Sequence, residues 1–212
     1  MEVIDVTGAE SGEYAPKAEE IKELRRITGA GMLDCKKALV ECRGDINSAM
    51  DALRKKGLAT VSKKAERTAS MGVVESYIHL GGKIGVLVEI NCETDFVAKT
   101  DEFKTLAREI AMHIAASNPF YIKRDDISDE ALAKEKEIQK ERVKEEGGKK
   151  PDNIIDKIVE GRMAKFYSEV CLLDQPFIRD ESKKIQDLIN DVIARVGENI
   201  VIRRFARFQI GD

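Results

Sequence analysis

Apolar residues recur every three or four positions between residues 17 and 58, and glycine-containing breaks divide this region into three. That spacing places the apolar side chains of each part on one face of a helix. The first break is a Thr-Gly-Ala-Gly string at 28–31. The second contains Gly44 and Asp45, residue types typical of a helix stop and a helix N-cap. We predict three short helices with a small shared core, the third ending before Gly57.

The pattern changes to β-type runs after residue 70. Residues 73–78 and 84–90 are rich in Val, Ile and Tyr, and the segment between them contains Gly81 and Gly82. Two such runs around a Gly-Gly turn predict an antiparallel hairpin. A third run at 199–210 interleaves apolar residues with arginines. We expect it to complete a three-stranded antiparallel sheet, which would bring the end of the chain back to its middle.

Helical patterns occupy the sequence between the second and third predicted strands. Residues 101–117 carry an apolar stripe and are followed by Asn118-Pro119, a pair that ends helices. Residues 128–168 have a thin apolar seam and dense charge, which is typical of a projecting antiparallel coiled-coil hairpin. Residues 182–196 form one more amphipathic pattern. The predicted fold class is therefore α+β, with a three-helix bundle followed by a core of sheet, helices and helical hairpin.

Composition and charge exclude several functional classes. The 36 Lys and Arg nearly balance the 39 Asp and Glu among 212 residues, and the net charge of −3 argues against a nucleic-acid-binding surface. No apolar run reaches the roughly 18 residues that suggest a membrane-spanning helix. Four cysteines without a C-x-x-C pair and only two histidines argue against a zinc site. We expect a cytoplasmic protein without metal or cofactor.

Charge also divides the chain into segments. Residues 1–16 contain four acidic residues and no Lys or Arg, and we expect them to be a disordered extension. Residues 54–67 contain six basic residues against one glutamate. We place a basic connector at 59–70, between a helical domain at 17–58 and a core domain at 71–212. The basic stretch is either a solvated linker helix or a docking stripe for an acidic partner or RNA, although no aromatic residues interleave with its charges.

The sequence contains no motif for a reaction or for nucleotide binding. The glycines at 28–31 lack the Lys-Ser/Thr pair that holds phosphate and Mg²⁺ in a phosphate-binding loop. No G-x-S-x-G string and no Cys/His arrangement with a supporting acid occurs. No carboxylate pair has the apolar setting that separates two pKa values. We predict that the protein is not an enzyme and acts through its surface.

The loop after the second predicted strand has the residues of a contact surface. It contains Thr94, Asp95, Phe96 and Val97, and Phe96 is conspicuous because only 5% of the residues are aromatic. Phe96 either anchors a partner or packs the following helix onto the core.

Met112 and His113 are a second candidate contact. At 100° per residue, Met112 falls on the charged side of its helix, and an apolar residue there suggests a contact. His113 lies at the edge of the apolar stripe, where it is either a contact residue or a satisfied, partly buried histidine.

Several strings of this sequence together resemble the elongation factor Ts family, the nucleotide exchange factors of bacterial elongation factor Tu. The most specific are T-G-A-G-M at 28–32 and T-D-F-V-A at 94–98. The resemblance spans about residues 17–211, and its matching segments are 27–39, 85–98, 110–117, 159–162, 175–177 and 197–200.

The resemblance implies a ubiquitin-associated-like fold for the N-terminal helices and a dimerisation core after them. It implies that the loop from Thr94 to Val97 docks on the nucleotide-binding domain of elongation factor Tu. There Phe96 would disturb the groups that hold Mg²⁺ and the β-phosphate, so that GDP leaves and GTP rebinds. It further implies that Met32 and Leu33 contact another part of that domain, and His113 matches a histidine of the contact region.

Longer members of the family carry two related core halves, whereas this chain has one strand-hairpin unit. It resembles the short forms, in which two chains pair, and we predict a homodimer that binds two partners. Arg203, Arg204 and Arg207 of the last predicted strand are candidates for the dimer edge. Two alternatives to exchange remain: an adaptor that binds through the helical domain, and an RNA-binding protein that uses the basic stretch.

Overall fold

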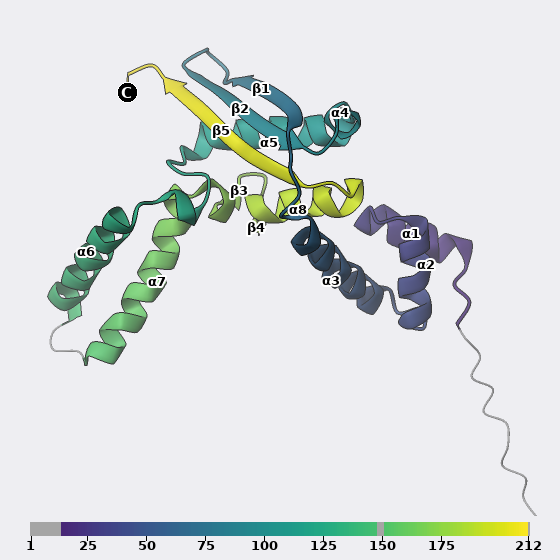
Figure 1. Cartoon of the computed structure of the whole chain (residues 1–212). Helices are drawn as coiled ribbons and strands as arrows, with labels where there is room; N and C mark the ends of the chain where they lie inside the picture. Colours follow the sequence, from purple (N-terminus) through teal and green to yellow (C-terminus); the bar gives the residue numbers. More distant parts are fainter. Residues whose placement is uncertain (1–13, 148–150, 212) are drawn as a thin grey trace, which may run out of the picture. The chain divides into compact units, whose positions relative to one another are not determined.

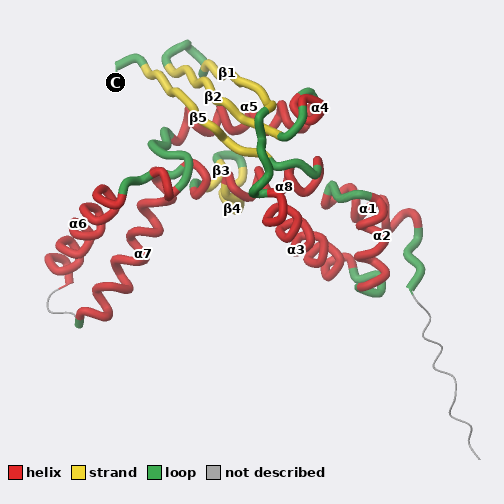
Figure 2. The backbone as a smooth tube through the Cα atoms, in the orientation of Figure 1, coloured by secondary structure: helices red, strands yellow, loops and turns green. Residues whose placement is uncertain are grey.

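The computed structural model describes residues 14–147 and 151–211 (Figures 1 and 2). The chain forms two compact units, Met1–Lys63 and Lys64–Asp212.

The first unit contains the three predicted helices. They are α1 (Ala18–Thr28), α2 (Met32–Glu41) and α3 (Ile46–Lys64), the last of which ends one residue into the second unit. Gly29 ends α1 in the left-handed region, and Asp45 accepts a hydrogen bond from the Ser48 backbone N–H, as expected for an N-cap. The core is formed by Leu24, Cys35, Ala38, Leu39 and Ala49.

The third helix does not end before Gly57, so that prediction is wrong. α3 continues through Gly57 to Lys64, and most of the basic stretch at 54–67 is therefore helical. A glycine inside a helix costs about 1 kcal/mol relative to alanine but does not stop it. A glycine stop requires a left-handed backbone, such as the φ of 69° at Gly29.

Tyr14 belongs to the folded first unit, although it lies within the predicted extension at 1–16. Its hydroxyl donates to Glu20 at 2.8 Å, and its ring lies against Gly44. Residues 1–13 lie outside the described part of the chain.

The second unit is built on the predicted three-stranded antiparallel sheet. Its strands are β1 (Met71–Ile78), β2 (Ile84–Cys92) and β5 (Ile200–Gln209), in the order β1-β2-β5. The register shifts between Glu89 and Ile90, which leaves Arg203 as the extra residue on β5. The hairpin and the return of the distant third strand are confirmed.

Helix α5 (Asp101–Ser117) covers one face of the sheet (Figure 1). Its apolar stripe is buried, and so are the alternate residues of β2 that face it. Thr100 caps the helix by accepting from the Phe103 N–H, and Asn118 ends it in the left-handed region. The residues that form this core include Val86, Val88, Ile90, Phe103, Ala107, Ile110 and Ile114.

The remaining elements flank this core. Helices α6 (Asp129–Gly147) and α7 (Asp152–Val170) form the predicted helical hairpin (Figure 2). Its buried residues are Val143, Ile155, Val159 and Met163. Residues 148–150, which connect the two helices, lie outside the described residues. The others are α4 (Asp95–Ala98), α8 (Ile185–Val196), β3 (Pro176–Phe177), β4 (Asp180–Lys184) and two short 3₁₀ turns at Arg124–Asp126 and Leu172–Asp174.

The last helix begins later than predicted. Residues 182–184 are not helical, because they belong to β4, which pairs with β3 in a small hairpin. Lys184 has an extended backbone and its N–H donates to Asp187, so the helix begins at Ile185. The short, fully exposed β4 has no alternating apolar pattern that could have indicated a strand.

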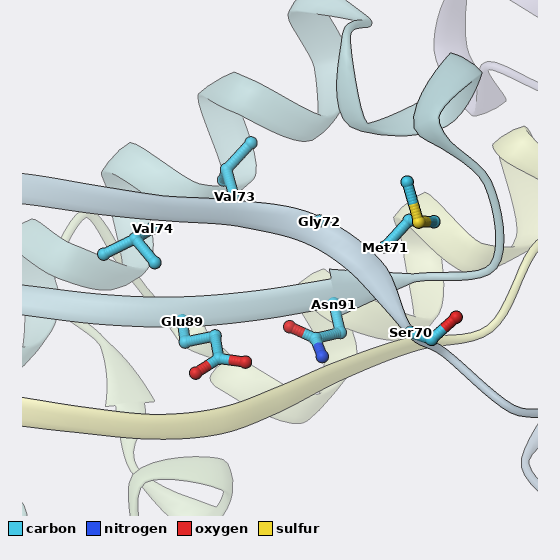
Figure 3. Close-up of a pocket in the computed structure, with 7 residues that line it drawn as sticks. All are labelled: Ser70, Met71, Gly72, Val73, Val74, Glu89 and Asn91. Atoms are coloured by element: carbon cyan, nitrogen blue, oxygen red, sulfur yellow. The ribbon is translucent and has the colours of Figure 1, made fainter.

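Gly72 allows β1 to approach β2 closely (Figure 3). Its φ is 150°, and a Cβ at this position would lie 2.1 Å from the backbone oxygen of Ile90. Gly72 also lines a hollow of about 200 Å³, together with residues that include Val74, Glu89 and Asn91. Only glycine satisfies both the dihedral angle and the contact.

Substitution Gly72→Ala is expected to lower the free energy of unfolding by about 3 kcal/mol, because it adds backbone strain to a clash with backbone atoms. Gly161→Ala is the matched control, since a Cβ there meets no atom within 4 Å on the exposed side of α7. It should stabilise the protein by roughly 1 kcal/mol. Urea denaturation measures the free energy of unfolding of both variants. An equal change in Gly72→Ala and Gly161→Ala would contradict the role of Gly72.

Candidate functional site

The loop that carries Phe96 follows directly from the central strand. β2 ends at Cys92, and Thr94 is the N-cap of the single-turn helix α4. The Thr94 hydroxyl accepts from the Val97 N–H at 3.4 Å, and the Cys92 thiol donates to the Thr94 carbonyl at 3.1 Å. The loop is therefore a continuation of the sheet with a defined helical turn.

Phe96 projects from this turn into solvent. Its side chain is 80% exposed, whereas Val97 and Ala98 beside it are buried. The interpretation in which Phe96 packs the next helix onto the core is therefore wrong, because Val97 and Ala98 do so. An exposed aromatic ring on a fixed backbone has the form of a binding anchor.

Asp95 gives the loop a negative charge next to the ring. Its carboxylate accepts from the Lys99 ammonium at 2.6 Å, one helical turn away. This hydrogen bond and the charge of Lys99 lower the pKa of Asp95. The carboxylate is thus ionised at neutral pH, and both groups are exposed, so the pair contributes little to stability.

Two glutamates hold the backbone of this loop, and the sequence reasoning did not identify them. Glu198 accepts from both the backbone N–H and the hydroxyl of Thr94, at 3.0 and 2.6 Å. Glu93 accepts from the backbone N–H of Asn199 at 2.7 Å. Both glutamates lie in matching segments, 85–98 and 197–200, but these segments gave no indication of the partners of the two side chains.

Met112 and His113 do not form the exposed contact that the sequence suggested. Met112 is half-buried. His113 is fully buried, and its ring is tilted against Phe177. A side chain with no exposed surface cannot touch a partner in this conformation. His113 instead fits the alternative of a buried histidine, with a hydrogen bond at one of its two ring nitrogens.

The hydrogen bonds of Gln175 determine the proton position on His113. The Gln175 amide N–H donates to the Glu169 carbonyl at 2.8 Å, so its oxygen is the acceptor for His113 Nε2 at 2.9 Å. Nε2 therefore carries the proton, and Nδ1 has no hydrogen-bond partner among the residues that the structure describes. Burial lowers the pKa of His113, with the hydrogen bond to Gln175 opposing it.

Met32 and Leu33 lie at the start of α2 in the first unit. Leu33 is 73% exposed and Met32 is 44% exposed, while Cys35, two positions after Leu33, faces the core. The start of the helix therefore presents apolar side chains to solvent. Asp34 forms an ion pair with Lys56 of α3 at 2.6 Å, which ties this end of α2 to the neighbouring helix.

The described residues include no group of three or more His, Cys, Asp or Glu that could hold a metal ion. Within the same part of the chain, no helix has the length and apolar character of a membrane span. The features that stand out are exposed apolar side chains on well-held backbone. Such exposed apolar side chains are typical of an interaction surface.

Comparison with known proteins identifies the family. The family model described as Elongation factor TS matches residues 49–212. Elongation factor Ts of Caldanaerobacter subterraneus subsp. tengcongensis is 60% identical over 195 residues, which are 92% of this chain and 96% of that protein. The Syntrophomonas wolfei protein of the same name is 62% identical over 92% and 90%, and that of Geobacter sulfurreducens 55% over 92% and 89%. The chain belongs to the elongation factor Ts family of translation elongation factors.

The buried His113 predicts a pH dependence of stability. Its folded-state pKa is lowered, so the unfolded chain binds the proton more readily, and stability falls as the pH drops below the unfolded value of about 6.5. His113→Gln keeps a donor and removes the titration. Between pH 7.5 and 5.5, wild type should lose more unfolding free energy in urea than the variant, by at most about 1.4 kcal/mol per pH unit. Equal losses would show that His113 titrates normally.

Proposed function

We propose that this protein binds elongation factor Tu and accelerates the release of GDP from it. The observation that carries the proposal is the fixed, exposed Phe96, in a loop whose sequence resembles the contact loop of the family. A buried aromatic anchor contributes a few kcal/mol to an interface. Phe96 is available for such a contact without rearrangement of its own backbone.

Exchange requires binding energy and no reaction by this chain. In the proposed complex, Phe96 enters the nucleotide-binding domain and displaces groups that hold Mg²⁺ and the β-phosphate. Because Mg²⁺ is the largest local charge in a nucleotide site, disturbing its ligands weakens GDP binding strongly. The ionised Asp95 adds a negative charge near the phosphates.

The direction of the effect follows from thermodynamic linkage. A protein that binds the nucleotide-free state more tightly than the GDP-bound state lowers GDP affinity by the same factor. GTP then rebinds, and the exchange factor leaves. The exposed Met32 and Leu33 supply a second contact to the same partner.

Removal of the anchor tests this proposal. Phe96→Ala should slow the release of a fluorescent GDP analogue from elongation factor Tu at least tenfold, since about 1.4 kcal/mol of contact energy corresponds to a factor of ten. The rate is measured by stopped-flow fluorescence at substoichiometric protein.

Phe120→Ala is the matched control, because Phe120 is a loop phenylalanine of similar exposure, 72%, and should leave the rate unchanged. An unchanged rate in Phe96→Ala would contradict the role of Phe96. Binding of the wild-type chain without faster GDP release would favour the adaptor function instead.

The outer face of the sheet is the surface we assign to the predicted homodimer. α5 covers the inner face, and on the outer face Val74, Ile78, Leu87 and Phe208 are exposed. The Nε of Arg204 donates to Glu89 at 2.7 Å beside them. A patch with apolar residues and both charges is self-complementary, as a two-fold interface requires.

Leu87→Arg should convert the dimer to a monomer, because it places a charge at the centre of this face. Multi-angle light scattering should give twice the chain mass for wild type and the chain mass for the variant. Leu58→Arg is the control, since Leu58 has a similar exposed fraction and lies in the first unit. A monomeric wild type would refute the homodimer, and a dimeric Leu87→Arg variant would refute this interface.

A further inference from the structure

We propose that Glu93 and Glu198 form a reciprocal clasp that positions the Phe96 loop, and that Glu198 is a positioning residue for the contact made by Phe96. This inference rests on the proposed function.

The clasp is reciprocal in its connections. Glu93 lies just after β2 and accepts from the backbone N–H of Asn199, whereas Glu198 lies just before β5 and accepts from the backbone N–H of Thr94. Each carboxylate thus satisfies a backbone donor of the opposite segment. The last β2–β5 pair is Cys92 with Ile200, so the clasp continues the sheet where its backbone ladder ends.

The clasp acts on the residue that begins the Phe96 turn. Glu198 uses both carboxylate oxygens on Thr94, one for the backbone N–H and one for the hydroxyl. The same hydroxyl accepts from the Val97 N–H and caps α4. Because the Thr94 hydroxyl donates to Glu198, its lone pairs remain directed at the helical turn. Glu198 therefore orients the cap that sets the direction of Phe96.

A third segment holds the clasp in place. The buried Asn199 side chain donates to the carbonyls of Ala65 and Arg67, at 3.3 and 2.8 Å. Arg67 also pairs with Glu93 at 3.4 Å. Hydrogen bonding to the Asn199 backbone, together with Arg67, lowers the pKa of Glu93. Residues 65–67, at the start of the second unit, thus hold both Glu93 and its partner Asn199.

Such a clasp favours binding by reducing its entropic cost. A loop that presents an exposed ring must otherwise be ordered when the partner binds, and each ordered residue costs free energy. Hydrogen bonds to a carboxylate are stronger than those between neutral groups, so they add to the hold that the buried Val97 and Ala98 have on the turn. The rigid turn leaves only the Phe96 side chain to be ordered on binding.

Substitution Glu198→Gln tests the clasp, because glutamine can accept only one of the two hydrogen bonds through its single oxygen. Hydrogen–deuterium exchange of the free, full-length chain should become at least several-fold faster at the amides of 94–98. Release of fluorescent GDP from elongation factor Tu should slow about tenfold. Glu181→Gln, an exposed glutamate of β4, is the control and should change neither.

A double-mutant cycle separates positioning from general stability. If Glu198 acts through Phe96, Glu198→Gln should not slow GDP release further in a Phe96→Ala background. An equal further loss in that background would overturn the positioning role. Thr94→Val removes the hydroxyl that Glu198 and Val97 share, and it should reproduce the Glu198→Gln effect.

The two proposals fail in different ways. If wild type does not accelerate GDP release, the proposed function fails, and the clasp is still judged by hydrogen–deuterium exchange on the free chain. Unchanged exchange at 94–98 in Glu198→Gln would overturn the clasp. Faster exchange with an unchanged GDP-release rate would overturn its role in positioning Phe96.

Discussion

The pairing of β2 with β5 is the interaction on which the second unit depends. β2 is the central strand, and its outer neighbour comes from the last residues of the chain. This pairing closes the inner face of the sheet over α5 and places Glu198 beside Thr94. Loop closure over about a hundred residues costs entropy, which the buried rows of both strands and α5 offset. The core and the Phe96 loop therefore depend on the same strand pairing.

Both units contain an exposed apolar side chain on a backbone that buried neighbouring residues fix in place. Phe96 directly precedes the buried Val97 and Ala98, and Leu33 lies two positions before the buried Cys35. A helical turn places successive side chains about 100° apart, so one residue can be exposed while its neighbours fix the backbone. This geometry exposes Phe96 and Leu33 as candidate binding anchors on a backbone that their neighbours hold.

The candidate site could be predicted only in part. Phe96 was identifiable because aromatic residues are few and it follows a predicted strand, although sequence alone left its exposure open. Glu198 could not be found, because its partner lies 104 residues away in the chain. The exposure of Met112 was wrongly predicted and the burial of His113 was left open. The apolar stripe of a helix predicts which side chains face one neighbouring element. Helix α5 has further neighbours, because it also packs against α8 and the His113 ring lies against Phe177 of β3.

The sequence by itself determined the long helices and the three strands of the main sheet, since hydrophobic periodicity, caps and turn glycines are local properties. It thereby determined the α+β class, the three N-terminal helices and the antiparallel sheet. Only the tertiary structure decided that α3 passes through Gly57, that β4 precedes α8, and which side chains remain exposed. These outcomes depend on which distant segment supplies a hydrogen-bond partner or a buried surface, and no local pattern records that choice.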